Sequence, residues 1–134
     1  MKVIQVAAGI INQKGRYLIA RRKLGVHLAG FWEFPGGKRE AGESLQECLQ
    51  RELFEELKIR VDLPVPYQIV RHDYLEKTVE LHFFRCVVVQ GQATPEDCDE
   101  VRWVLPEELP HFKFPPADQV IIDALQRDAG RSLR

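Results

Sequence analysis

Residues Gly37–Ile59 read GKREAGESLQECLQRELFEELKI, and this stretch decides the fold around it. Ser44 stands three residues before Glu47, a capping-box spacing that predicts the start of a helix. Leucines then recur at i, i+4 and i+8 and give that helix one apolar stripe: Leu49, Leu53 and Leu57. The stretch therefore predicts an amphipathic helix that packs one face on the rest of the chain.

The flanking sequence predicts strands and a second helix. The apolar run Val3–Ile11 is typical of a buried strand, and Asn12–Gly15 predicts a hairpin turn into a strand at Arg16–Arg22. Further strands are expected at Phe31–Phe34, Gln68–Leu75, Lys77–Val89 and Val101–Leu105. Apolar residues at helical spacing predict a helix near the end: Val120, Ile121, Ala124 and Leu125. This order favours the α/β (α+β) class, a mixed sheet with packed helices, in one domain over residues 1–134.

The composition is that of an ordinary globular chain. Of 134 residues, 45% are hydrophobic and 29% charged, and the formal net charge is -1. No global basic field therefore draws the chain to nucleic acid or an anionic membrane, and no apolar stretch approaches the ~20 residues of a membrane span. The scattered Cys48, Cys86 and Cys98 favour reduced thiols and a cytoplasmic location. Monomer and homodimer both stay open.

Three carboxylates on the predicted helix point to metal chemistry. Glu52, Glu55 and Glu56 stand at i, i+3 and i+4, so they share a face, where like charges cost an isolated helix ~0.2–0.5 kcal/mol per pair. Mg²⁺ is held by carboxylate oxygens together with substrate phosphates, so this face would suit Mg²⁺ and a polyphosphate. The competing interpretation is a solvated acidic face on which Arg51 makes surface ion pairs.

A glycine pair before the helix favours the metal interpretation. Gly36 and Gly37 follow a strand and let the backbone approach a ligand or metal closely, so the Gly37 carbonyl is a candidate ligand. Glu43 is expected either to pair with Arg51 or to act as a base.

The spacing of these residues resembles the Nudix box. Gly37, Glu43 and Arg51–Ile59 fit the pattern G-x5-E-x7-R-E-U-x-E-E-x-G-U, in which U is apolar, and Lys58 alone departs from it by replacing the second glycine. Three further segments are similar to the MutT branch of that family: Ala20–Arg22 with His27, Phe31–Lys38 and Phe114–Asp118. A helix commonly ends on a left-handed glycine, so Lys58 is expected either to accept that strain or to leave the helix by another route.

The resemblance implies a mixed β-sheet sandwiched between α-helices, and a Mg²⁺-dependent hydrolase with Mn²⁺ as substitute. Water would attack a nucleoside triphosphate and release the monophosphate and pyrophosphate. The implied metal ligands are Gly37, Glu52, Glu55, Glu56 and a loop carboxylate, best placed at Asp97, with Glu96 and Glu100 as rivals. Either Glu52 or Glu56 would orient or deprotonate the water.

Seven residues are candidates for nucleotide contact. Gly36 belongs to the close-approach turn. Arg22 and Lys38 are expected at phosphate, with ordinary surface charge as the alternative. His27 would contact nucleotide or cap a loop, and Tyr74 would lie on the far side of the base pocket. The resemblance places Phe34 at the nucleotide, although a lone aromatic more often fills a core.

Asp118 is the seventh candidate, and its chemistry bears on the choice of base. Its place at a helix start also fits an N-terminal cap, but the MutT resemblance puts it at the base edge. An ionised Asp only accepts hydrogen bonds, which suits N4 of cytosine or N7–H of an 8-oxo-purine. It suits O6 of guanine only when Asp118 is protonated.

Three functions compete. The leading one is hydrolysis of 8-oxo-dGTP or a related oxidised nucleotide, which would sanitise the nucleotide pool. The second is pyrophosphohydrolysis of (d)CTP or 5-hydroxy-(d)CTP. The third is a Nudix-like module that binds nucleotide without hydrolysis, which the presence of all three box carboxylates disfavours; hydrolysis of a sugar dinucleotide such as ADP-ribose is a further, weaker alternative.

Overall fold

The computed structural model describes residues 2–132, and β1 (Lys2–Gln13) is the strand on which the others assemble. It pairs in parallel with β7 (Lys77–Cys86), and along its opposite edge it pairs antiparallel with β4 (Gly36–Lys38) and then β2 (Arg16–Arg21). The antiparallel neighbour of β7 is β6 (Val65–Asp73).

Short strands complete the sheets. Trp32–Glu33 forms β3 and Glu100–Val104 forms β9, and both pair with β2. Within residues 2–132 these strands make one seven-stranded sheet. A second, two-stranded sheet joins β5 (Arg60–Val61) to β8 (Val88–Gln90).

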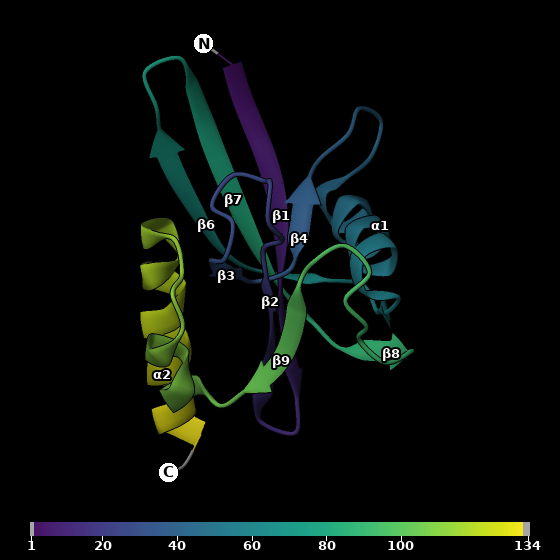
Figure 1. The fold of residues 1–134 in the computed structure, drawn as a ribbon, viewed down its shortest axis with the longest axis vertical. Coiled ribbons are helices and arrows are strands. Elements are labelled where there is room, and N and C mark those ends of the chain that lie inside the picture. The colour runs from purple at the N-terminus through teal and green to yellow at the C-terminus, as the bar shows by residue number, and fades with distance from the viewer. Residues whose placement is uncertain (1, 133–134) are drawn as a thin grey trace.

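Helices cover the two faces of the large sheet, so the predicted sandwich is confirmed (Figure 1). The helix α1 (Leu45–Leu57) lies on one face, and α2 (Gln119–Ser132) lies on the other with two short 3-10 helices, Pro106–His111 and Pro116–Asp118. None of the helices within residues 2–132 has the length and apolar character that a membrane crossing requires.

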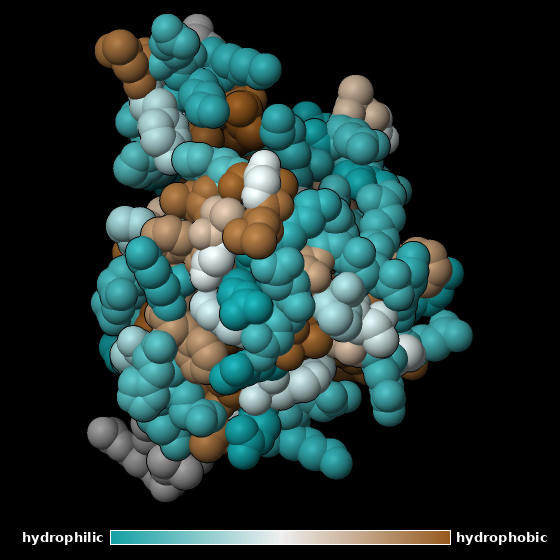
Figure 2. Space-filling model, in the orientation of Figure 1, coloured by the Kyte–Doolittle hydropathy of each residue, from teal (hydrophilic) through white to brown (hydrophobic). Residues whose placement is uncertain are grey.

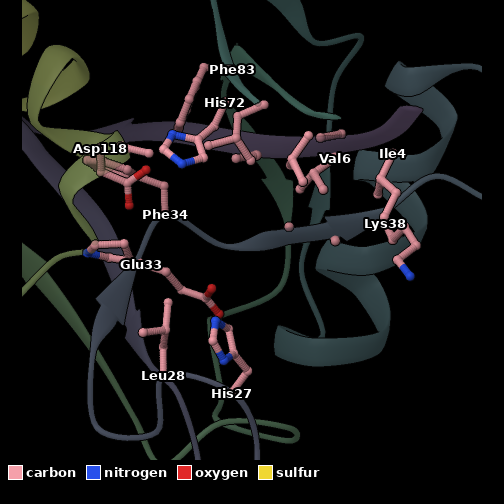
Figure 3. A pocket seen from close by; sticks show the side chains of 18 of the residues that line it. Ile4, Val6, His27, Leu28, Glu33, Phe34, Lys38, His72, Phe83 and Asp118 are labelled. Atoms are coloured by element: carbon pink, nitrogen blue, oxygen red, sulfur yellow. The ribbon is translucent and has the colours of Figure 1, made fainter. Parts of the chain in front are cut away.

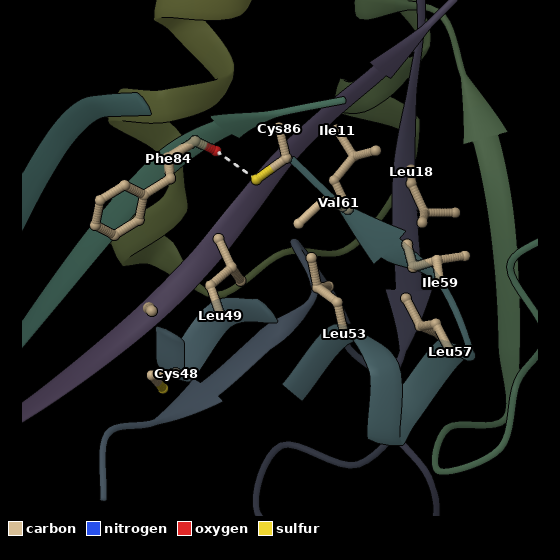
Figure 4. Packing of buried hydrophobic residues seen from close by; sticks show 11 residues of the cluster. Ile11, Leu18, Cys48, Leu49, Leu53, Leu57, Ile59, Val61, Phe84 and Cys86 are labelled. Carbon is tan, nitrogen blue, oxygen red and sulfur yellow. Dashed lines mark hydrogen bonds between the residues drawn. The ribbon is translucent and has the colours of Figure 1, made fainter. Parts of the chain in front are cut away.

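The alternation of side chains along each strand explains the two cores. Ala7 and Ile11 of β1 pack against α1, whereas Ala8 and Ile10 pack on the side of α2. Figure 4 shows the first core, in which the predicted leucine stripe of α1 meets the sheet. On the surface shown in Figure 2, most residues are hydrophilic, and a group of hydrophobic residues is exposed near the centre of the view.

Both ends of α1 follow from its sequence. The Ser44 hydroxyl accepts from the Glu47 amide at 3.0 Å, and the Glu47 carboxylate accepts from the Ser44 amide at 2.8 Å, so the predicted capping box is present. Lys58 ends the helix in the left-handed conformation at φ 60°, and its amide donates to the Phe54 carbonyl at 3.0 Å. Of the two expected exits, Lys58 takes the strained one, with its ammonium 5.2 Å from the Phe54 ring centre.

Several strand boundaries were wrong. The expected strand Phe31–Phe34 is reduced to Trp32–Glu33, and Lys77–Val89 is broken between Cys86 and Val88. The strand β4 was not expected from the sequence, because its two glycines have low strand propensity. A side chain at Gly36 would overlap the backbone carbonyl oxygen of Ala7, so β4 can pair with β1 only through glycine.

Candidate active site

A cavity of about 460 Å³ opens on the α2 side of the sheet (Figure 3). Its floor is apolar and comes from alternate residues of β1 and β7, including Ile4, Val6, Leu81 and Phe83. Every predicted nucleotide-contact residue lines this cavity: Arg22, His27, Phe34, Gly36, Lys38, Tyr74 and Asp118. The structure therefore brings this predicted set together, and the individual roles stay predictions.

Asp118 lies at one side of the cavity and Lys38 at the opposite one (Figure 3). The Asp118 side chain is 7% exposed, and burial, with a smaller effect of the Glu33 charge, raises its pKa to about 7. The protonated and ionised carboxyl are therefore both populated near neutral pH. Asp118 ends a 3-10 helix immediately before α2.

Phe34 serves both the core and the cavity. The ring is 4% exposed and packs against Phe83, with ring centres 6.2 Å apart, and against Phe114 at 5.1 Å. The two expectations for this aromatic residue are thus compatible. Phe34 is a core residue that presents part of its surface to the cavity.

Arg22 is tied into the wall of the cavity. Its Nε donates to the His27 carbonyl at 2.7 Å, and its Nη1 lies 2.9 Å from Glu33 Oε2. Burial raises the pKa of Glu33, and the Arg22 charge partly offsets this. Arg22 therefore holds the loop containing His27 against β3, and its contact with phosphate stays a prediction.

Tyr74 stands on the rim of the cavity. It is 50% exposed, its ring centre lies 4.5 Å from that of His72, and the Lys77 ammonium lies 5.7 Å from it. His72 and Lys77 also line the cavity. The tip of the β6–β7 hairpin thus adds an aromatic and cationic rim to the cavity.

The carboxylates of α1 are held by one guanidinium. Arg51 Nε and Nη2 contact the two oxygens of Glu43 at 3.0 and 2.8 Å, and Nη1 contacts Glu52 at 2.9 Å and Glu55 at 3.3 Å. The Arg51 hydrogen bond is the main cause that lowers the pKa of Glu43 to about 2. Of the two roles expected for Glu43, the structure shows the pairing with Arg51.

Glu56 lies next to Glu52 and has a different environment. Burial first, and then the charge of Glu52, raise the pKa of Glu56 to about 9. Glu55, in contrast, is 58% exposed on its side chain. The three box carboxylates therefore differ: Glu52 and Glu56 are partly enclosed neighbours, and Glu55 faces solvent beside Arg51.

Gly37 brings the cavity to these carboxylates. A side chain at Gly37 would overlap the carboxylate of Glu52, so the absence of a Cβ lets the carboxylate pack directly on the backbone of β4. The Cys48 thiol, which is also on α1, donates to the Gly37 carbonyl oxygen at 3.5 Å. Since Gly36, Gly37 and Lys38 also line the cavity, β4 is the boundary between the two halves of the site.

The predicted carboxylate ligands do not converge on one metal position in this structure. Within the described chain, no three His, Cys, Asp or Glu side chains are placed so that they could hold one metal ion together. Arg51 engages Glu52 and Glu55, and Lys23 engages Asp97 at 2.5 Å. The donor chemistry nevertheless suits a hard divalent cation, because Glu52 and Glu56 are adjacent carboxyls whose mutual repulsion a cation would relieve.

Two residues with a clear place in the site were missed. Glu33 is a half-buried acid within an aromatic strand segment, and this signal was available in the sequence. Lys23 follows two arginines and resembles any surface charge. Its partner Asp97 is 74 positions away, so only the folded chain reveals the pair.

This sheet, with a carboxylate helix on one face and a cavity on the other, is the architecture of a known class. Residues 6–124 match the NUDIX domain, and the chain belongs to that family. The predicted family and fold class are thus confirmed.

Individual relatives and a solved structure resemble the chain over most of its length. The chain is 33% identical to the CTP pyrophosphohydrolase of Escherichia coli (strain K12), over 92% of each chain. It is 36% identical to the 8-oxo-dGTP diphosphatase of Haemophilus influenzae, again over 92% of each. The crystal structure of a MutT protein from Methanosarcina mazei Go1 matches 96% of each chain with a TM-score of 0.81 and 28% identity.

Proposed function

We propose that this protein is a Mg²⁺-dependent nucleoside triphosphate pyrophosphohydrolase whose preferred substrate is 8-oxo-dGTP or a related oxidised nucleotide. One observation carries the proposal: Gly37 packs on the Glu52 carboxylate and lines the cavity, so a phosphate chain that leaves the cavity meets the carboxylates of α1. Relatives named for 8-oxo-dGTP and for CTP support the same reaction.

Each half of the site has its own task in this proposal. Glu52, Glu55, Glu56, Asp97 and the Gly37 carbonyl would hold Mg²⁺, with Mn²⁺ as substitute, and Mg²⁺ would supply charge neutralisation of the phosphates and a lowered pKa for water. Glu56 or Glu52 accepts a proton from the attacking water. The water oxygen bonds to phosphorus, the bond between the α and β phosphates breaks, and monophosphate and pyrophosphate leave.

Positive groups orient the phosphates. Lys38 lies at the end of the cavity near Gly37. Arg22 bonds His27 through Nε and Glu33 through Nη1, which leaves Nη2 for a phosphate. A guanidinium fixed by two other bonds is preorganised, so it loses little freedom when phosphate binds.

Asp118 and Phe34 select the base. With a pKa of about 7, Asp118 can donate its proton to a carbonyl such as O6, or accept a bond from N7–H of an 8-oxo-purine. The ionised form also suits N4 of cytosine, so (d)CTP and its 5-hydroxy derivative are the second candidate substrates. The protonated form favours an 8-oxo-purine as the substrate, because a protonated carboxyl can donate to O6 and an ionised carboxylate cannot.

Steady-state kinetics on 8-oxo-dGTP, dGTP, 5-hydroxy-dCTP and dCTP test the choice of substrate. We expect kcat/KM for 8-oxo-dGTP to exceed that for dGTP by at least about tenfold, because a site built to hydrogen-bond a substrate N–H discriminates against its absence. A kcat/KM for dCTP well above that for 8-oxo-dGTP would replace the leading substrate by the second. Binding of these nucleotides without any pyrophosphate release would favour the non-catalytic module.

The setting we propose is the cytoplasm, in nucleotide-pool sanitation that lowers mutation. Support comes from the thiols of Cys48, Cys86 and Cys98, which form no disulfide.

A further inference from the structure

Lys23 and Asp97 join two loops at the edge of the cluster of α1 carboxylates, Glu52, Glu55 and Glu56. The Lys23 ammonium lies 2.5 Å from Asp97 Oδ1, and the side chains are 46% and 56% exposed. Lys23 follows Arg22 at the end of β2, and Asp97 belongs to the segment between β8 and β9. The pair thus closes a contact between segments that the sequence places far apart.

The segment that carries Asp97 is fixed on both sides by backbone hydrogen bonds. The Glu96 amide donates to the Glu56 carbonyl at 3.0 Å, and the Thr94 amide donates to the Leu57 carbonyl at 3.0 Å. After Asp97, the Asp99 amide donates to the Arg21 carbonyl at 3.0 Å. Asp97 is therefore anchored to the end of α1 and to the end of β2, and its place beside Glu56 does not depend on Lys23.

The charge of Lys23 interacts with the α1 carboxylate cluster, through Glu56, as well as with Asp97. The hydrogen bond to Asp97 is the main cause that raises the pKa of Lys23, with smaller contributions from the charges of Asp99 and Glu56. Asp97 in turn contributes to the raised pKa of Glu56. The contact with Asp97 therefore places the Lys23 charge at the edge of the proposed metal site.

We propose that Lys23 is the resident counter-cation of Asp97 and competes with the divalent cation for that carboxylate. The inference rests on the proposed function, in which Asp97 is a metal ligand. An ammonium that hydrogen-bonds a carboxylate occupies oxygen lone pairs that a metal ion needs, and its charge repels the ion. Lys23 is a positioning residue in this account, since it acts through Asp97 and must release it when the ion binds.

Isothermal titration of Mn²⁺ into the nucleotide-free protein tests this competition. We expect Lys23→Gln to bind Mn²⁺ about 3- to 10-fold more tightly than wild type, because no ammonium then occupies the Asp97 oxygen that the ion would use. Lys14→Gln is the matched control, since Lys14 is an exposed lysine in the β1–β2 turn, and its Kd should stay within about twofold of wild type. Lys23→Arg keeps the charge and should bind as wild type does.

The Asp97→Asn background shows whether the effect passes through Asp97. There, Lys23→Gln should no longer tighten Mn²⁺ binding, because the contested carboxylate is gone. Thermal unfolding of each variant verifies that the chains are folded at the titration temperature.

Three results would overturn the inference, and they can be told apart. An unchanged or weaker affinity in Lys23→Gln, in a wild type that binds Mn²⁺ and hydrolyses nucleotide, overturns the role of Lys23 and leaves the proposed function intact. A gain that persists in the Asp97→Asn background shows a general charge effect instead. A folded wild type that binds no Mn²⁺ and releases no pyrophosphate rejects the proposed function together with this inference.

Discussion

Two carboxyl groups in this molecule have a pKa far above the ordinary range, and burial is the main cause for both. Glu56, with a pKa of about 9, has the carboxylate of Glu52 as its neighbour, so a bound cation would let it ionise. Asp118, with a pKa of about 7, lies at the wall of an apolar cavity. The same physical cause thus suits Glu56 to a metal site and Asp118 to the recognition of a base.

Asp118 makes the stability of the fold depend on pH. The folded protein keeps the Asp118 proton up to about pH 7, whereas an unfolded Asp loses it near pH 4. The stability that Asp118 contributes is therefore fully present below about pH 4 and is lost as the pH rises through 7. Asn does not titrate, so the free energy of unfolding of Asp118→Asn relative to wild type should rise by about 2 to 3 kcal/mol between pH 5 and pH 8.5.

Urea unfolding of both proteins at the two pH values measures this difference. Asp123→Asn is the control, because Asp123 is exposed on α2 and its substitution should show little pH dependence. An equal difference between wild type and Asp118→Asn at both pH values would contradict a raised pKa.

At the scale of elements, α1 was predictable because its signals are local. The capping box at Ser44 and the leucine stripe lie within one helix, and both are observed. The strand β4 was not predictable in this way, since Gly36 pairs with Ala8 far away in the chain and has no strand propensity of its own. A long-range pairing also explains the break in the predicted strand Lys77–Val89, because β7 pairs with β1 whereas β8 pairs with β5.

Lys58 stores strain at the end of α1. Lys58→Gly should raise the free energy of unfolding by roughly 1 kcal/mol, because glycine adopts the left-handed conformation without steric cost. Lys58→Ala, which keeps the strain and loses the contact with Phe54, should give no such gain. Denaturant unfolding compares the two, and kcat should change less than twofold or so in Lys58→Gly, since Lys58 lies outside the ligand set. A large loss of turnover would show a catalytic role for Lys58.

Gly37 is the point at which β4 and α1 meet. Gly37→Ala would place a methyl group on the Glu52 carboxylate and displace it, so kcat should fall about 100-fold or more, as small misplacements of reacting groups do. Gly15→Ala is the control: a side chain at Gly15 would meet no atom within 4 Å, and only its φ of 80° would be strained. That variant should lose stability and keep its kcat. A wild-type kcat in Gly37→Ala would refute the contact between β4 and the carboxylates as the basis of the site.

At the scale of the whole molecule, the sheet separates two tasks. The helix α1 packs on one face and the cavity opens on the other, and β4, which pairs with β1, borders both (Figure 1). The metal set was proposed from the box and the nucleotide set from the resemblance to MutT proteins, and the roles of both sets stay predictions. The nucleotide set lines one cavity. The sequence did not predict the pairings of Arg22 with Glu33 or of Lys23 with Asp97, because long-range ion pairs leave no periodic signal.

The proposal that the α1 carboxylates catalyse hydrolysis is tested most directly by pyrophosphate release from 8-oxo-dGTP in Mg²⁺. The proteins to compare are wild type, Glu56→Gln and Glu107→Gln. Glu107→Gln removes the same charge from an exposed site in the 3-10 helix at Pro106–His111 and should match wild type. Glu56→Gln should lower kcat by about 100-fold or more and still bind the nucleotide, because it loses a proton acceptor and metal ligand and leaves the cavity intact. Wild-type kcat in Glu56→Gln, or no Mg²⁺-dependent pyrophosphate release by wild type from any triphosphate, would contradict the account.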